Sequence, residues 1–129
     1  AGDPLAKAFS QAPSSGIPIP LLHFWEEEDH FELNRIFSQQ EVILLLIDDV
    51  ITKAGAKREA IEAARKAGFI VRDVLVLIDR EQGGKEELKK IDVRLHAGFI
   101  ITALLDFYVD QKIIPERKRK EVIDYLLAS

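Results

Sequence analysis

The sequence predicts an α/β fold, a parallel β-sheet with flanking helices. A continuous apolar run at 41–47, bounded by polar residues, is typical of a strand covered on both faces in a parallel sheet, and a second buried strand is expected at 69–78, where five apolar residues follow Arg72 and Asp73. An alanine-rich segment with helical periodicity lies between them, and a third short strand is expected at 93–97. Strands that alternate with helices over short connections favour a parallel sheet with right-handed crossovers.

The first helix is predicted over 57–68 and closes with Gly68 as a C′ residue. Asp48 and Asp49 are expected to end the first strand. On one face this helix carries four apolar residues: Ala60, Ile61, Ala64 and Ala67.

Two further helices are predicted in the C-terminal third, after a short helix at 85–90. The first carries an apolar stripe, and the second begins at about Pro115, a residue suited to a first turn, and ends at Leu127. The stripe consists of Ile101, Leu104, Leu105 and Tyr108.

Length and composition define broad limits on function. The 129 residues, 47% of them hydrophobic, allow one core, so we expect a single domain at 1–129, with a divergent part at 1–40 and the ligand-binding core at 41–129. A net charge of −4 argues against a nucleic-acid partner or an anionic membrane surface. The longest strongly apolar run, 42–47, is far shorter than the roughly 20 residues of a membrane span.

The residue types that are missing add two expectations. The sequence has no cysteine, which excludes disulfides and thiolate chemistry. It has no methionine either, which indicates a processed chain, a fragment or an engineered derivative. We expect a cytoplasmic protein, or an organellar one after removal of a transit peptide.

The candidate site lies at the carboxyl edge of the expected sheet, where the loops that begin at Asp48 and Asp79 meet. Asp48 and Asp49 precede a small-residue turn, 52–56, that opens a helix. Carboxylates can hold sugar hydroxyls or hydrated Mg²⁺, and the free N–H groups of a helix N-terminus suit a phosphate. The alternative is that Asp48 or Asp49 only caps the strand end or a turn.

The first loop is similar to a known motif. A hydrophobic strand, then Asp48-Asp49-Val50-Ile51-Thr52, a small-residue turn and a helix resembles the phosphoribosyl-diphosphate-binding motif of the type I phosphoribosyltransferases. The second loop, 79–85 (DREQGGK) after the strand, resembles that of orotate phosphoribosyltransferases, including those fused in uridine monophosphate synthases. The run 93–96 and the helix after it follow in the same order as in that family. The resemblance is good from about residue 41 to the C-terminus and weaker over 2–40.

This resemblance implies a Rossmann-like core of the type I phosphoribosyltransferase kind. It also implies that the core lacks the N-terminal hood, which is the part of the family's fold that covers orotate. It implies transfer of ribose 5-phosphate from phosphoribosyl diphosphate to orotate, with Mg²⁺ carried by the diphosphate near the two aspartates rather than by protein ligands alone. A homodimer or a subunit of a larger complex is implied as well. By position, the ribose hydroxyls would meet Asp48 and Asp49, the 5-phosphate would meet Thr52, Lys53, Ala54, Gly55 and Ala56, and orotate would meet Arg80.

Three departures from the family favour other interpretations. Lys53 and Ala54 stand where the family has Thr or Ser followed by Gly, and the hood is absent. The segment 22–33 is acidic where the family has a basic loop, and each such charge near a diphosphate would cost on the order of 1 kcal/mol. The alternative is a non-catalytic subunit, scaffold or nucleotide sensor, a pseudoenzyme of this fold, or a truncated derivative.

Several other features have ordinary structural explanations. An acidic loop at 23–30 is favoured over a metal site, and the aromatic residues at 24, 25 and 31 are either core or a partner surface. A basic patch at Lys112 and 117–120 is treated as a solvated helix face. The alternative interpretation of Arg80 is an exposed cation in the loop. His96 is expected to end the third strand and to have a structural role.

Overall fold

The computed structural model describes residues 7, 8, 11 and 42–128. The extended stretch expected at 17–24 and the acidic segment 22–33 lie outside the described residues. From residue 42 onward the elements are β1 (Ile43–Ile51), α2 (Gly55–Lys66), β2 (Ile70–Asp79), α3 (Gly84–Lys89), β3 (Arg94–Ile100), α4 (Ile101–Asp110) and α5 (Glu116–Ala128).

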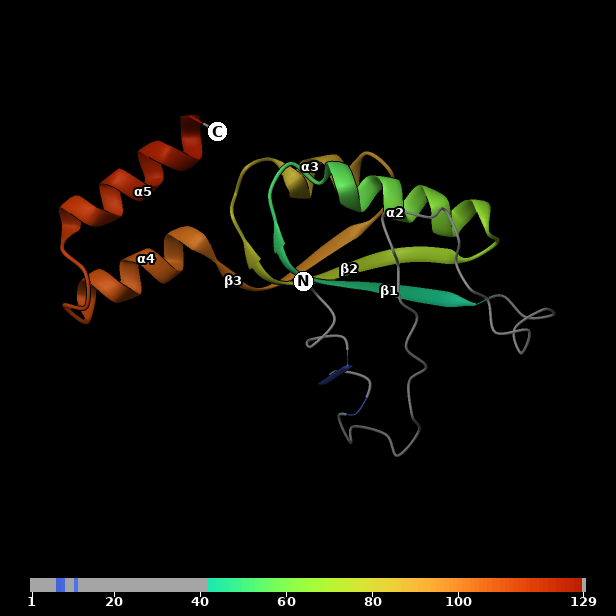
Figure 1. The fold of residues 1–129 in the computed structure, drawn as a ribbon, viewed down its shortest axis with the longest axis horizontal. Helices are drawn as coiled ribbons and strands as arrows, with labels where there is room; N and C mark the ends of the chain where they lie inside the picture. Colours follow the sequence, from blue (N-terminus) through green and yellow to red (C-terminus); the bar gives the residue numbers. More distant parts are fainter. Residues whose placement is uncertain (1–6, 9–10, 12–41, 129) are drawn as a thin grey trace.

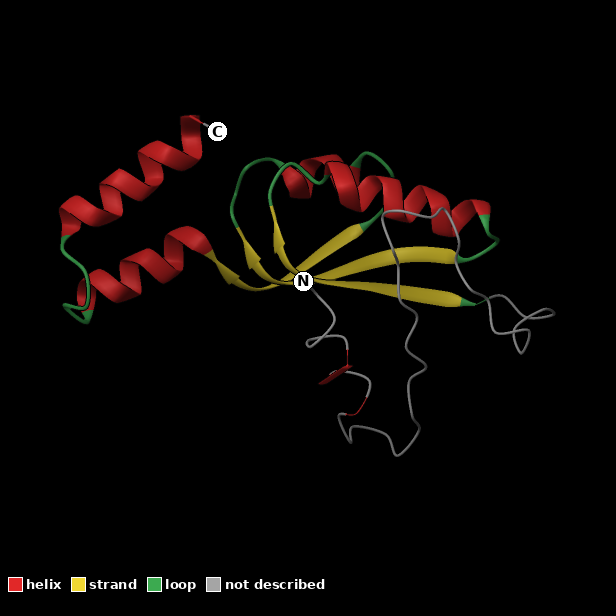
Figure 2. Ribbon diagram, viewed as in Figure 1, coloured by secondary structure: helices red, strands yellow, loops and turns green. Residues whose placement is uncertain are grey.

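The three strands form one parallel sheet in the order β1-β2-β3. Because both crossovers move in the same direction across the sheet, a common hand places both connecting helices on one face. Figures 1 and 2 show α2 and α3 together above the strands. The predicted α/β fold with a parallel sheet is therefore confirmed.

The core fills the layer between this sheet face and the two helices. Alternate residues of β2 point into it, and α2 and α3 contribute small or branched side chains from one face. The most deeply buried side chains are Ile51, Ile61, Val74, Val76 and Leu88.

The first strand is longer than predicted, because the two aspartates do not end it. Asp48 pairs with Val76, and Ile51 pairs with Asp79. The residues at 50 and 51 are β-branched, and β2 continues beside them, so the parallel ladder extends past the charged pair.

The expectation that the strands are covered on both faces is wrong for the described part of the chain. Within 42–128, α2 and α3 cover one face only, and several large apolar side chains on the strands remain exposed. They include Ile43, Leu45 and Leu77, with exposed fractions of 40–63%.

The helix predicted over 57–68 begins and ends slightly earlier, as α2. Gly68 has a φ of 92°, so the left-handed C′ conformation is confirmed. Ala60, Ile61 and Ala64 are buried as predicted, but Ala67 is the C-cap and is exposed, because the helix ends before its side chain can reach the sheet.

The last two helices form a pair that extends from the end of β3, away from the sheet (Figure 1). Both were predicted, but in the predicted stripe of α4 only Leu105 is fully buried, because α5 and the end of β3 give limited cover. His96 lies inside β3, opposite Leu75, and does not end the strand as expected. Among the described residues, no helix is long and apolar enough to span a membrane.

Candidate functional site

The two loops singled out in the sequence lie side by side at the carboxyl edge of the sheet. The strand register places Ile51 beside Asp79, and the Arg80 N–H donates to the Ile51 carbonyl oxygen over 3.1 Å. This bond continues the parallel ladder one step beyond the strands. The residues after β1 and those after β2 therefore share one edge, as expected for a ligand site on a parallel sheet.

Gly84 allows the two loops to touch. A Cβ atom on this residue would overlap the Thr52 carbonyl oxygen and would lie 2.7 Å from Cγ1 of Ile51. Only a residue without a side chain lets α3 begin against the turn that follows β1. The close approach fixes the position of the first loop relative to the second.

The turn at 52–56 ends in a left-handed residue that begins α2. Ala54 has φ 62° and ψ 12°, is buried, and acts as N-cap, and its carbonyl oxygen accepts the first helical hydrogen bond from Arg58 N–H. This conformation normally favours glycine, so alanine keeps the glycine geometry at an energetic cost. No side chain in the described part of the chain caps the helix, which leaves the first-turn N–H groups of Gly55 and Ala56 at the positive end of its dipole.

Asp48 and Asp49 are neighbours in β1, and their carboxyl groups interact with each other. Asp48 pairs with buried Val76, on the face covered by α2. Its Oδ2 accepts a 2.7 Å hydrogen bond from Lys57 Nζ, and its Oδ1 accepts the Asp49 N–H over 2.8 Å. Among the described residues, Lys57 therefore pairs with Asp48 and not with Asp49.

The surroundings of Asp48 keep its carboxyl group ionised. Partial burial raises the pKa of Asp48, but hydrogen bonds from Lys57 and from the Asp49 N–H, with the charge of Lys57, outweigh burial and lower the pKa below its usual value. Lys57 itself is well shielded, with its side chain 13% exposed. The site thus contains a compensated ion pair beside the small-residue turn.

The second loop is ordered by its own side chains. Asp79 is buried, and its Oδ1 accepts the Glu81 N–H over 2.8 Å. The Glu81 carboxylate accepts the N–H of Thr102 in the first turn of α4 over 3.2 Å. Arg80, which lies between these two acids in the sequence, is half-buried. Within 42–128 its guanidinium group takes part in no ion pair. That group is therefore available for an anionic ligand.

Sequence reasoning missed two contacts of this site. Lys57 was not predicted to bind Asp48, although its place in the first turn of the helix after the acids was a usable signal. Gln82 was also missed: its Nε2 donates to the Leu126 carbonyl oxygen over 3.0 Å and so ties the second loop to α5.

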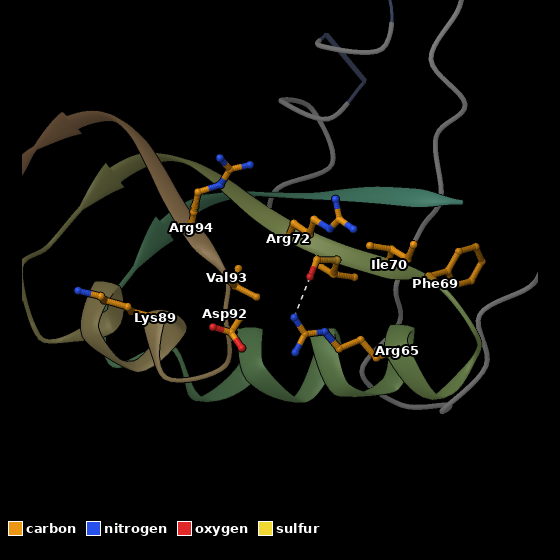
Figure 3. A pocket seen from close by; sticks show the side chains of 9 residues that line it. Arg65, Phe69, Ile70, Arg72, Lys89, Asp92, Val93 and Arg94 are labelled. Carbon is orange, nitrogen blue, oxygen red and sulfur yellow. Dashed lines mark hydrogen bonds between the residues drawn. The ribbon is translucent and has the colours of Figure 1, made fainter. Parts of the chain in front are cut away.

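A cavity of about 580 Å³ lies at the other end of the sheet, where β2 and β3 begin. Arg65 spans it and donates from Nη2 to the Val71 carbonyl oxygen over 2.8 Å. In Figure 3 the charged ends of Lys89 and Arg94 point away from Arg65 rather than toward a common point. Because its cationic groups do not converge, we assign no ligand to this cavity.

The parallel sheet with its flanking helices has the fold of solved phosphoribosyltransferases. The structure is similar to an orotate phosphoribosyltransferase from Mycobacterium tuberculosis in complex with inorganic phosphate, with a TM-score of 0.65 and 24% identity over 78% of this chain and 56% of that one. This likeness shows the fold.

Curated sequences identify the relatives more closely. An orotate phosphoribosyltransferase from Sulfolobus acidocaldarius is 32% identical over 84 residues, 65% of this chain and 43% of that protein. A uridine 5'-monophosphate synthase from Bos taurus is 37% identical over 70 residues, 54% of this chain and 15% of that protein. No protein-family profile matches the chain. The resemblance to orotate phosphoribosyltransferases is confirmed, and the chain spans less than half the length of these two relatives.

Proposed function

We propose that the chain has an orotate phosphoribosyltransferase-like role in pyrimidine biosynthesis, the transfer of ribose 5-phosphate from phosphoribosyl diphosphate to N1 of orotate. The observation that carries this proposal is the contact between the two loops, where Thr52 meets Gly84 and Arg80 extends the ladder from Ile51. The contact brings acids, a helix N-terminus and an arginine to one edge of the sheet. The names of the curated relatives support the same role.

Each part of the edge suits one part of the substrates. The N–H groups at the start of α2 would hold the 5-phosphate, because the positive end of the helix dipole favours an anion. Asp48 and Asp49 would meet the ribose hydroxyls. Arg80 would bind orotate, because a planar guanidinium group matches a carboxylate with two parallel hydrogen bonds.

Mg²⁺ is expected to enter with the substrate. Among the described residues, no group of three or more His, Asp or Glu side chains could hold a metal ion. Asp48 and Asp49 still provide the hard oxygen donors that Mg²⁺ prefers. These two residues fit a Mg²⁺ ion that is bound mainly by diphosphate and water. Such an ion would neutralise negative charge on the diphosphate leaving group.

Catalysis would depend on positioning and charge rather than on a protein nucleophile. The ribose carbon would lose its bond to diphosphate, which takes the electron pair, and would gain a bond to N1 of orotate while the N1 proton passes to water. A cationic ribose in the transition state is stabilised by nearby carboxylates. Holding donor and acceptor in line supplies the rest of the rate enhancement.

A second candidate function is a non-catalytic phosphoribosyltransferase-fold subunit, scaffold or nucleotide sensor. Three features favour it: the acidic residues Glu26, Glu27, Glu28, Asp29 and Glu32, the alanine at position 54, and the engagement of Asp48 by Lys57. We propose that turnover takes place in a homodimer or in a larger complex.

A turnover assay separates the two functions. Purified chain with Mg²⁺, phosphoribosyl diphosphate and orotate should form orotidine monophosphate, and Arg80→Ala should reduce the rate at least about tenfold, since a lost hydrogen bond to a charged group costs about 1.5–3 kcal/mol. Lys85→Ala removes an exposed cation from α3 and should leave the rate unchanged.

The result that opposes catalysis is equally clear. No product, even after addition of a full-length relative that is inactivated at its own arginine, would defeat the enzyme proposal. Tight calorimetric binding of phosphoribosyl diphosphate without turnover would then support the nucleotide sensor.

A further inference from the structure

Lys57 stands in an unusual place for a cation. It occupies the third position of α2, close to the positive end of the helix dipole, where an acidic residue would be favourable and a basic one is not. Its side chain is only 13% exposed, so its ammonium group has lost most of its water. Both conditions are unfavourable unless a negative charge compensates them.

Asp48 provides that charge. Its Oδ2 lies 2.7 Å from Lys57 Nζ, and its other oxygen accepts the Asp49 N–H. Each carboxylate oxygen therefore already has a donor from the protein. The pair is located between β1 and α2, directly behind the turn at 52–56.

The neighbouring acid has a different environment. Asp49 follows Asp48 directly in β1, and its carboxyl group interacts with that of Asp48. The described residues provide no cationic partner for the Asp49 carboxylate, in contrast to that of Asp48.

We propose that Lys57 is a positioning residue of the proposed sugar-phosphate site: it holds Asp48 against α2 and neutralises it, so that Asp49 is the carboxylate that binds the ribose hydroxyls. The inference rests on the proposed function and makes it more specific. With Lys57 present, the two acids carry one net negative charge rather than two. An anionic donor then meets less repulsion as it approaches the turn.

The test is calorimetric titration of the full 129-residue chain with phosphoribosyl diphosphate and Mg²⁺. Lys57→Met should weaken binding about tenfold or more, because it leaves Asp48 charged and unpaired beside the phosphate turn. Asp48→Asn added to Lys57→Met should recover part of that loss, because it removes the uncompensated charge. Lys66→Met, at an exposed position in the last turn of α2, removes the same charge and should shift the Kd less than twofold, about the effect of a screened surface charge.

Comparison of the two aspartates distinguishes positioning from simple stabilisation. Asp49→Asn should weaken donor binding about tenfold, a clearly larger loss than Asp48→Asn causes. Equal losses at both positions would overturn the proposal, as would a Lys57→Met variant that binds like Lys66→Met.

Urea unfolding separates this inference from the proposed function. Asp48→Asn and Lys57→Met should be non-additive in their effects on the free energy of unfolding, and additive effects would refute the contact whatever the donor does. A wild-type chain that shows this coupling but binds no donor would defeat the proposed function and, with it, the assigned role of Asp49.

Discussion

Gly84, the first residue of α3, lies against the backbone carbonyl oxygen of Thr52, with no room for a Cβ atom between them. Thr52 belongs to the turn after β1, whereas Gly84 follows the loop after β2. One glycine therefore determines how closely the two halves of the candidate site approach each other. Gly83 beside it has a φ of 91° and turns the chain into α3, so the two adjacent glycines perform different tasks.

Gly84→Ala should destabilise the protein strongly. The added methyl group would overlap main-chain atoms and the Ile51 side chain, which cannot all move away, so we expect a loss of about 2–3 kcal/mol in the free energy of unfolding. Gly55→Ala is the matched control, because nothing lies within 4 Å of its would-be Cβ atom, and it should be neutral or stabilising by up to about 1 kcal/mol. Urea unfolding of both variants measures this difference, and similar stabilities would show that the loops are not in contact.

Ala54→Gly should be nearly neutral, although it removes a buried methyl group. Relief of the left-handed conformation, about 1–2 kcal/mol, offsets the lost burial and the greater freedom of glycine in the unfolded chain. Ala60→Gly, at another buried alanine of α2, has no such relief and should cost about 1–2 kcal/mol. Thermal unfolding compares the two variants. If both variants lose the same free energy of unfolding, replacing Ala54 by glycine relieves no backbone strain.

The overall fold was accessible from the sequence because its signals are local. The apolar run that gives β2 and the alanine-rich face of α2 each specify their element without reference to the rest of the chain. The end of β1 was not accessible in this way. Asp48 and Asp49 are typical residues for ending a strand, but the neighbouring β2 supplies partners up to Ile51, and pairing between strands outweighs local preference.

The candidate site was predicted in its location but not in its internal contacts. Parallel strands end at a common edge, so the adjacency of the two loops follows from topology. The pairing of Asp48 with Lys57 depends on which face of β1 meets α2, and that requires the register of the whole sheet. The contact of Gln82 with the far end of α5 joins residues 44 positions apart, and no short-range pattern indicates it.

Stability should fall in acid partly through Asp48. Burial raises its pKa, but the Lys57 ammonium and the Asp49 N–H lower it more, so the folded-state pKa lies below the usual 3.8. A lowered folded pKa gives stability that is present above the unfolded-state value and is lost as the pH falls through the folded one. The free-energy gap between wild type and Asp48→Asn should therefore narrow below about pH 4. Unfolding at pH 6, 4 and 2.5 measures the gap, and a constant gap would contradict the ion pair.

Gln82 links the second loop to α5, but burial of its side chain also carries an unfavourable free energy. Its Nε2 donates to the Leu126 carbonyl oxygen, while its Oε1 is buried without a partner among the described residues. Gln82→Met keeps the shape and loses one hydrogen bond, but it also removes the unsatisfied oxygen, so the net change should stay within about 1 kcal/mol.

Gln82→Ala loses the packing as well and should cost about 1–2 kcal/mol more than the methionine variant. Because the contact joins the loop to α5, the alanine variant should also speed hydrogen exchange of the amides at 122–128, with little change in β2. Faster exchange spread evenly over the sheet would mean that Gln82 stabilises the whole domain rather than the attachment of α5. Unchanged exchange in α5 would show that the helix is held by other contacts.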